Sequence, residues 1–165
     1  MPDVVVSTAE LGQRTVRRSD FVSCNQAFID CRTPGSDRKE NYAMIGPGVS
    51  QSSGQFVNLR LPHGYNIGAA AMPHGITNNL HLHYTAEVFV CTAGEYLLRW
   101  GADGTEGELL LKAGDIASVP TWIFRGSPTP ARTTAGCSPC SAWTTPAASS
   151  GAPRSCVRPN STACT

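Results

Sequence analysis

Residues 75–94, GITNNLHLHYTAEVFVCTAG, contain two histidines one residue apart and a glutamate four positions after the second. Side chains two positions apart on a β-strand leave the same face about 7 Å apart along the chain, so His81 and His83 can reach one ion. Glu87 follows after a gap long enough for the chain to turn and bring a carboxylate to the same point. Two imidazoles and a carboxylate suit one divalent ion of Fe, Mn, Ni or Zn. The alternative is an ordinary strand with exposed or hydrogen-bonded histidines.

The surrounding sequence has the pattern of a β protein. Residues 56–61 alternate in polarity, residues 87–101 predict two strands around Ala93-Gly94, and Asp103-Gly104 predicts a turn into a further strand at residues 109–111. Another turn at Gly114 leads into a strand. Short strands without helices between them favour an antiparallel barrel or sandwich. Only residues 7–14 carry a helical start signal, because Ser7 and Glu10 have the spacing of a capping box.

Length and charge restrict the class of protein. The chain has 165 residues, which is enough for one domain, and 15% charged residues with a net charge of +1. This balance argues against nucleic acid or an anionic membrane as a partner and favours a small-molecule ligand. The first 20 residues contain no apolar run long enough for export or for a membrane span. We therefore expect a soluble cytoplasmic protein.

The spacing of the two histidines, the glutamate and the glycines at 75 and 94 resembles the first conserved motif of the cupin superfamily at every fixed position. The second cupin motif is matched in part by residues 114–126, GDIASVPTWIFRG, at Gly114 and Pro120. Trp122 stands where that motif has a glycine, and Arg125 stands where it has the last metal-binding histidine. The resemblance covers residues 52–126 and is to small bacterial single-domain cupins with arginine at this position. It implies an all-β fold, a small cupin-type antiparallel β-barrel of jelly-roll kind, with one divalent metal ion inside on His81, His83 and Glu87.

Arg125 leaves two roles open. A guanidinium stays protonated and cannot donate a lone pair to a metal. It can hold an anionic substrate beside the ion, which makes Arg125 the predicted substrate-binding residue. It can equally form a salt bridge with Glu87, and in that case the metal is absent.

Several other residues are weaker candidates for the site. His63 and His74 each lie in a Pro-His-Gly sequence, which indicates a turn before it indicates a ligand. Cys91 is expected to be a small core residue. Four aromatic residues are candidates either for the pocket lining or for the core: Phe89, Trp100, Trp122 and Phe124.

Composition divides the chain into three parts. Residues 1–51 are expected to form an N-terminal arm with a short helix and edge strands, and residues 52–126 the barrel core. Residues 127–165 contain none of the 12 acidic residues and no Leu, Ile, Phe, Tyr or Met. We expect this tail to be irregular, so that the barrel lacks its closing strands.

A shifted reading frame near Gly126 is one hypothesis for the tail, because displacement by one base allows Phe-Thr-Asn at residues 127–129, where the second cupin motif ends in Asn. A disordered tail is the alternative, and the Cys137-x-x-Cys140 pair is a weak sign of half a zinc knuckle. A barrel without closing strands exposes unpaired edges, so association of copies, for example as a homodimer, is expected.

Three functions remain open. The first is a metal-dependent enzyme acting on a small organic substrate, a dioxygenase before an isomerase or lyase, since open positions on a His-His-carboxylate ion can bind substrate and O₂. No catalytic residue is assigned. The second is a non-catalytic cupin that binds a small ligand. The third is an inactive product of a frameshifted cupin gene.

Overall fold

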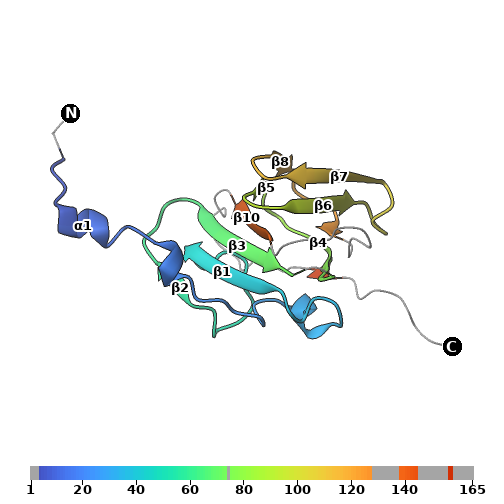
Figure 1. Cartoon of the computed structure of the whole chain (residues 1–165), viewed down its shortest axis with the longest axis horizontal. Helices are drawn as coiled ribbons and strands as arrows, with labels where there is room; N and C mark the ends of the chain where they lie inside the picture. Colours follow the sequence, from blue (N-terminus) through green and yellow to red (C-terminus); the bar gives the residue numbers. More distant parts are fainter. Residues whose placement is uncertain (1–3, 74, 128–137, 145–155, 158–165) are drawn as a thin grey trace.

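The computed structural model of the chain describes residues 4–73, 75–127, 138–144 and 156–157, and its regular structure is almost entirely β-strand (Figure 1). The elements in chain order are α1 Thr8–Gly12, the 3₁₀ turns η1 Arg18–Asp20 and η2 Ile29–Arg32, and the strands β1 Glu40–Ile45, β2 Val57–Leu59, β3 Asn66–Met72, β4 Asn78–Leu82, β5 Glu87–Cys91, β6 Glu95–Trp100, β7 Gly107–Lys112, β8 Ile116–Val119, β9 Arg125–Ser127, β10 Ser138–Thr144 and β11 Cys156–Val157.

The described strands form two sheets. One sheet has the order β2-β1-β3-β10-β5-β8, and the other has the order β11-β4-β9-β6-β7. Apart from the parallel β1–β2 pair, the paired strands in these sheets run antiparallel. The prediction of an all-β antiparallel fold is therefore confirmed. Within the described residues the sheets do not join into a closed barrel.

The hairpins predicted from local sequence are present. β5 and β6 flank Gly94, which has a φ of 64°, and β6 pairs with β7 from Glu95↔Lys112 to Trp100↔Gly107. The first glycine of the cupin-like motif, Gly75, has a φ of 82°, so both motif glycines adopt a backbone conformation that other residues rarely tolerate. The inward faces of β5 to β8 supply the main apolar cluster, which contains Phe89, Cys91, Tyr96, Leu98, Leu111 and Val119. Cys91, with no exposed surface, is a core residue as predicted.

The N-terminal helix begins where the sequence predicts. Ser7 accepts a hydrogen bond from the backbone of Glu10, and the Glu10 carboxylate accepts one from the backbone of Ser7, which completes the capping box. None of the residues of α1 is buried, and the helix stands apart from the two sheets in Figure 1. In the described part of the chain, no helix is long and apolar enough to cross a membrane.

The expectation of a wholly irregular tail is wrong at residues 138–144. These residues form β10, which lies between β3 and β5 and pairs with both strands. Pro139 is opposite Ala71 of β3, whereas the pairing with β5 begins only at Cys140. The proline therefore sits where the strand is paired on one side, which is where a missing N–H is tolerated. β10 thus connects β3 to β5 within one sheet, and the frameshift hypothesis stays a prediction.

The arm that precedes β1 is bound to the sheets. Cys24 forms a β-bridge with Asn41, and the Ser36 hydroxyl donates to the carbonyl of Thr77 at 2.7 Å, just before β4. Ser36 has no exposed surface. Residues 24–39 thus cover the side of the molecule on which β4 carries His81.

Candidate functional site

The predicted metal ligands come from both sheets. His81 is on β4 and His83 follows the end of that strand, while Glu87 begins β5 in the other sheet. The three side chains line one cavity of about 130 Å³, and the two imidazole rings are 5.0 Å apart between centroids. The period-two spacing on the strand and the turn at residues 84–86 bring these groups to the same cavity.

Arg125 lies directly opposite His81 in the pairing of β4 with β9. It is 2% exposed, and its Nε donates to Oε2 of Glu87 at 3.0 Å. Its Nη2 forms an ion pair with the same carboxylate oxygen, and its Nη1 donates to the backbone carbonyl of His81 at 3.3 Å. The salt bridge to Glu87 is the arrangement that the sequence offered as the alternative to substrate binding.

The two histidines are neutral at physiological pH. Burial, the charge of Arg125 and the proximity of His83 lower the pKa of His81 to about 3, against smaller raising effects of Glu87 and of the Asn79 carbonyl. Burial also lowers the pKa of His83 to about 4, although Glu87 opposes the shift. Nδ1 of His81 is 2.7 Å from the Asn79 carbonyl, which can only accept, so Nδ1 carries the proton and Nε2 keeps its lone pair.

Glu87 is ionised. Burial by itself would raise the pKa of this carboxyl, but the charge of Arg125, electrostatic interaction with His83 and His81, and the hydrogen bond from Arg125 bring the pKa below its ordinary value. Both hydrogen bonds from Arg125 end on Oε2. The carboxylate and the guanidinium therefore balance each other's charge in a buried position.

These residues fit a metal ion only in part. Two adjacent neutral imidazoles, one with its tautomer fixed by a carbonyl, are suitable nitrogen donors. The carboxylate is held by the guanidinium instead. In the described residues, no group of three or more His, Cys, Asp or Glu side chains is arranged to hold a metal ion. The role of His81, His83 and Glu87 as a three-residue ligand set therefore stays a prediction.

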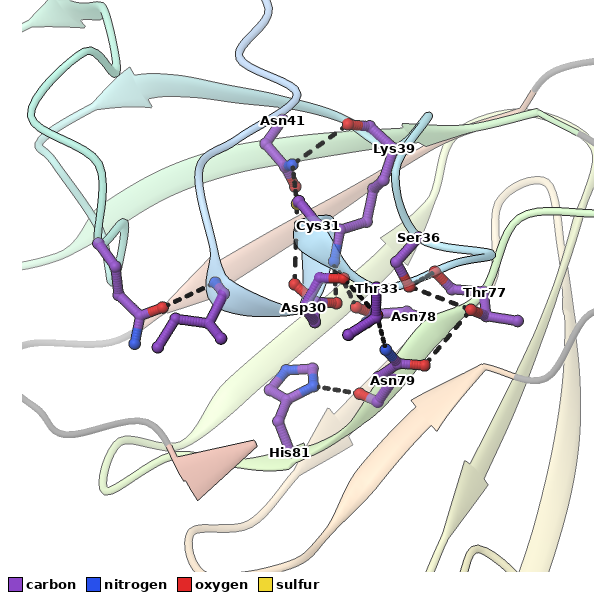
Figure 2. A network of polar contacts seen from close by, with 12 residues as sticks. Asp30, Cys31, Thr33, Ser36, Lys39, Asn41, Thr77, Asn78, Asn79 and His81 are labelled. Carbon is purple, nitrogen blue, oxygen red and sulfur yellow. Dashed lines mark hydrogen bonds and ion pairs between the residues drawn. The ribbon is translucent and has the colours of Figure 1, made fainter. Parts of the chain in front are cut away.

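The sequence did not point to a second polar group on the cavity wall. Lys39, Asp30 and Asn78 line the same cavity as the histidines, and Lys39 and Asp30 are each 3% exposed. Figure 2 shows Lys39 reaching from the start of β1 to Asp30 and Asn78. No alternation of polarity marks Lys39 in the sequence, because the buried residues 39, 41 and 43 are Lys, Asn and Ala while their more exposed neighbours include Tyr42 and Met44. Asp30 lies in a 3₁₀ turn, which has no period-two pattern either.

The remaining candidates lie in different places. Phe89 lines the cavity, whereas Trp122 is 63% exposed and packs edge-on against Tyr84. His63 bonds to the carbonyl of Leu61, and among the described residues that line the cavity His63, Trp100 and Phe124 do not occur. His74 is outside the described residues.

Comparison with known proteins shows similarity of fold. A DMSP lyase, DddQ from Ruegeria pomeroyi DSS-3, is 19% identical with a TM-score of 0.51, covering 72% of this chain and 51% of that one. A structure described under the DMSP lyases RdDddP and RnDddQII is 16% identical with a TM-score of 0.54, covering 77% and 58%. Vicilin from Capsicum annuum is 12% identical with a TM-score of 0.56, covering 84% and 33%. This chain thus spans about half the length of the two lyase chains.

No protein-family model matches the chain, and no curated protein sequence matches it. The structural similarity is at low identity, so it carries the fold and not the chemistry. Together with the two antiparallel sheets, it establishes a cupin-like β fold.

Proposed function

We propose that this chain is a cupin-type protein that binds a small organic molecule in its cavity and contacts the polar group of that molecule with His81 and His83. The observation that carries the proposal is a pair of neutral, adjacent imidazoles on the wall of a cavity that is otherwise largely apolar. Small-molecule sites combine such an apolar wall with a few polar groups that orient the ligand.

The hydrogen bonding of the two rings is incomplete, which supports the proposal. Nε2 of His81 has a free lone pair because Nδ1 holds the proton. Nδ1 of His83 is buried and has no hydrogen-bond partner among the described residues. Buried polar atoms are rarely left without a partner, so a bound hydroxyl or carbonyl group is the natural completion of this site.

A metal-dependent enzyme, a dioxygenase before an isomerase or lyase, is the second candidate. It is favoured by the fixed tautomer of His81 beside a second neutral imidazole. His81 and His83 would hold the divalent ion, and Glu87 would join them only after release from Arg125. Such an ion supplies Lewis acidity, and as Fe(II) it also supplies redox chemistry with O₂.

Imidazole NMR tests the first candidate directly. The ¹H–¹⁵N signals of His81 and His83, assigned from the variants His81→Gln and His83→Gln, should shift when para-fluorobenzamide is added as a neutral aromatic probe. His63, which bonds to a loop carbonyl away from the cavity, is the control within the same molecule. Signals of His81 and His83 that do not move, or that move no more than those of His63, would contradict binding at this site.

A further inference from the structure

The cavity contains a buried lysine that the histidine site does not use. The Nζ of Lys39 donates to Oδ2 of Asp30 at 2.6 Å and to Oδ1 of Asn78 at 2.8 Å. It also lies 5.3 Å from the centroid of the Phe28 ring. An ammonium group has three N–H bonds, and two of them are taken by these acceptors, which leaves one for an acceptor inside the cavity that Lys39 lines.

The lysine is fixed in position by its neighbours. Asn78 belongs to β4, three residues before His81, so the strand that carries the histidine also holds the ammonium. On the next residue, the Asn79 side chain donates to Thr33 of the arm at 2.7 Å, and the Asn79 carbonyl accepts from His81 (Figure 2). The arm and the histidine are thus tied to one short segment of β4, which makes Lys39 a rigid recognition group.

Charge balance limits what the cavity can bind. Among the described residues that line it, the charged ones are Asp30, Lys39 and Glu87, and Glu87 is paired with Arg125. Each cation already faces its own carboxylate. A ligand with a net charge would enter a buried site in which no opposite charge is left for it, and an unpaired buried charge is costly.

The other residues of the cavity wall favour a ligand whose main part is apolar. Phe28, Tyr42, Ile67, Ala69 and Phe89 line the cavity together with the polar groups. Aromatic and aliphatic side chains of this kind bind a ring or a branched hydrocarbon by area burial.

We propose that Lys39 is a ligand-binding residue that donates to a hydroxyl, carbonyl or ether oxygen, and that the ligand of this cavity is an uncharged, mainly apolar small molecule. This inference rests on the proposed function, because it requires a ligand beside His81 and His83. The sequence predicted an anionic substrate beside Arg125. An uncharged ligand takes its place here, because Arg125 and Lys39 are each already paired with a carboxylate.

A matched pair of probes tests the inference in the unaltered protein. Para-fluorobenzamide and para-fluorobenzoate have the same ring and differ in charge, and ¹⁹F NMR titration gives the affinity of each. We expect the amide to bind at least about tenfold more tightly than the carboxylate. Equal affinity, or tighter binding of the carboxylate, overturns the inference and leaves the proposed function standing. If neither probe binds, both fail.

Two variants assign the effect to Lys39. In Asp30→Asn the ammonium loses its counter-charge, so the carboxylate probe should gain about tenfold in affinity. The double variant Asp30→Asn with Lys39→Met removes both charges and the donor, so the amide should bind about fivefold more weakly, as expected for one lost hydrogen bond. Lys112→Met, at an exposed lysine, is the control and should leave both affinities unchanged. Unchanged amide affinity in the double variant, with a retained cooperative unfolding transition, overturns the role of Lys39.

Discussion

The guanidinium of Arg125 on β9 donates from two nitrogens to a single carboxylate oxygen of Glu87 on β5, and so joins the two sheets across the interior. Both residues are almost fully buried. In the cupin-like motif that this chain resembles, the position of Arg125 belongs to a metal-binding histidine. The ion pair places a protein cation next to the carboxylate that the motif otherwise offers to a metal.

Removing one partner of this pair should be more damaging than removing both charges. Arg125→Met leaves Glu87 buried and unpaired, and we expect the free energy of unfolding to fall by about 3–5 kcal/mol. The double variant Arg125→Met with Glu87→Gln contains no buried charge at this point and should lose clearly less. Chemical denaturation of the three proteins measures both values. A double variant as unstable as the single one would show that the arginine acts by packing and not by charge.

Acid should destabilise the protein through its histidines. The unfolded chain protonates histidine near pH 6.5, whereas folded His81 and His83 stay neutral until their pKa values of about 3 and about 4. Between about pH 6.5 and pH 4 the unfolded state therefore binds more protons, and the free energy of unfolding falls as the pH is lowered, by roughly 1.4 kcal/mol per pH unit for each histidine.

The variant His83→Gln tests the source of this slope. It removes one of the two groups, so its free energy of unfolding should decline less steeply over the same pH range than that of the unaltered protein. Denaturation curves at pH 6.5, 5.5 and 4.5 are sufficient. Equal slopes for the two proteins would mean that His83 is not protected from protonation by folding.

Replacing Gly126 by a residue with a side chain should destabilise the protein, because β4 lies directly beside this position. A Cβ at this position would collide with the carbonyl oxygen of Asn78 and touch the backbone of Asn79 on β4. Gly126→Ala should therefore separate β9 from β4 and cost about 1–3 kcal/mol or more in stability. Gly54→Ala, where the nearest atom is an ordinary contact with Ser52 at 3.6 Å, is the matched control and should stay within about 0.5 kcal/mol. Equal stability of the two variants would mean that β9 and β4 are not in close contact.

Local sequence was sufficient to predict the strands that form hairpins. Alternation and turn glycines act over a few residues, and β5 to β8 follow them. Trp122 stands where the second cupin motif has a glycine. Its φ is 66°, so the backbone at this position has the conformation that a glycine adopts readily, although the side chain is large. The departure from the motif at Trp122 is thus one of side chain and not of φ.

Long-range partners could not be predicted with the same success. The strand at residues 138–144 contains a proline, which disfavours a central strand, and its place depends on pairing with β3 and β5 and not on its own preference. The ion pair between Lys39 and Asp30 was missed for a related reason. Asp30 and Lys39 are nine residues apart, and no pattern in the sequence between them indicates that a 3₁₀ turn and the start of a strand will meet inside a cavity.

We propose that the ion pair with Arg125 keeps Glu87 from binding a metal ion, and a calorimetric titration with Ni²⁺ tests this most directly. The unaltered protein should show no tight binding of one ion per chain. Arg125→His frees the carboxylate and adds an imidazole opposite His81, so it should bind one ion at least about tenfold more tightly. Adding His81→Gln to that variant should abolish the gain, which separates this site from ions held by the cysteines. Tight binding of one Ni²⁺ per chain by the unaltered protein, lost in His81→Gln, would contradict the claim.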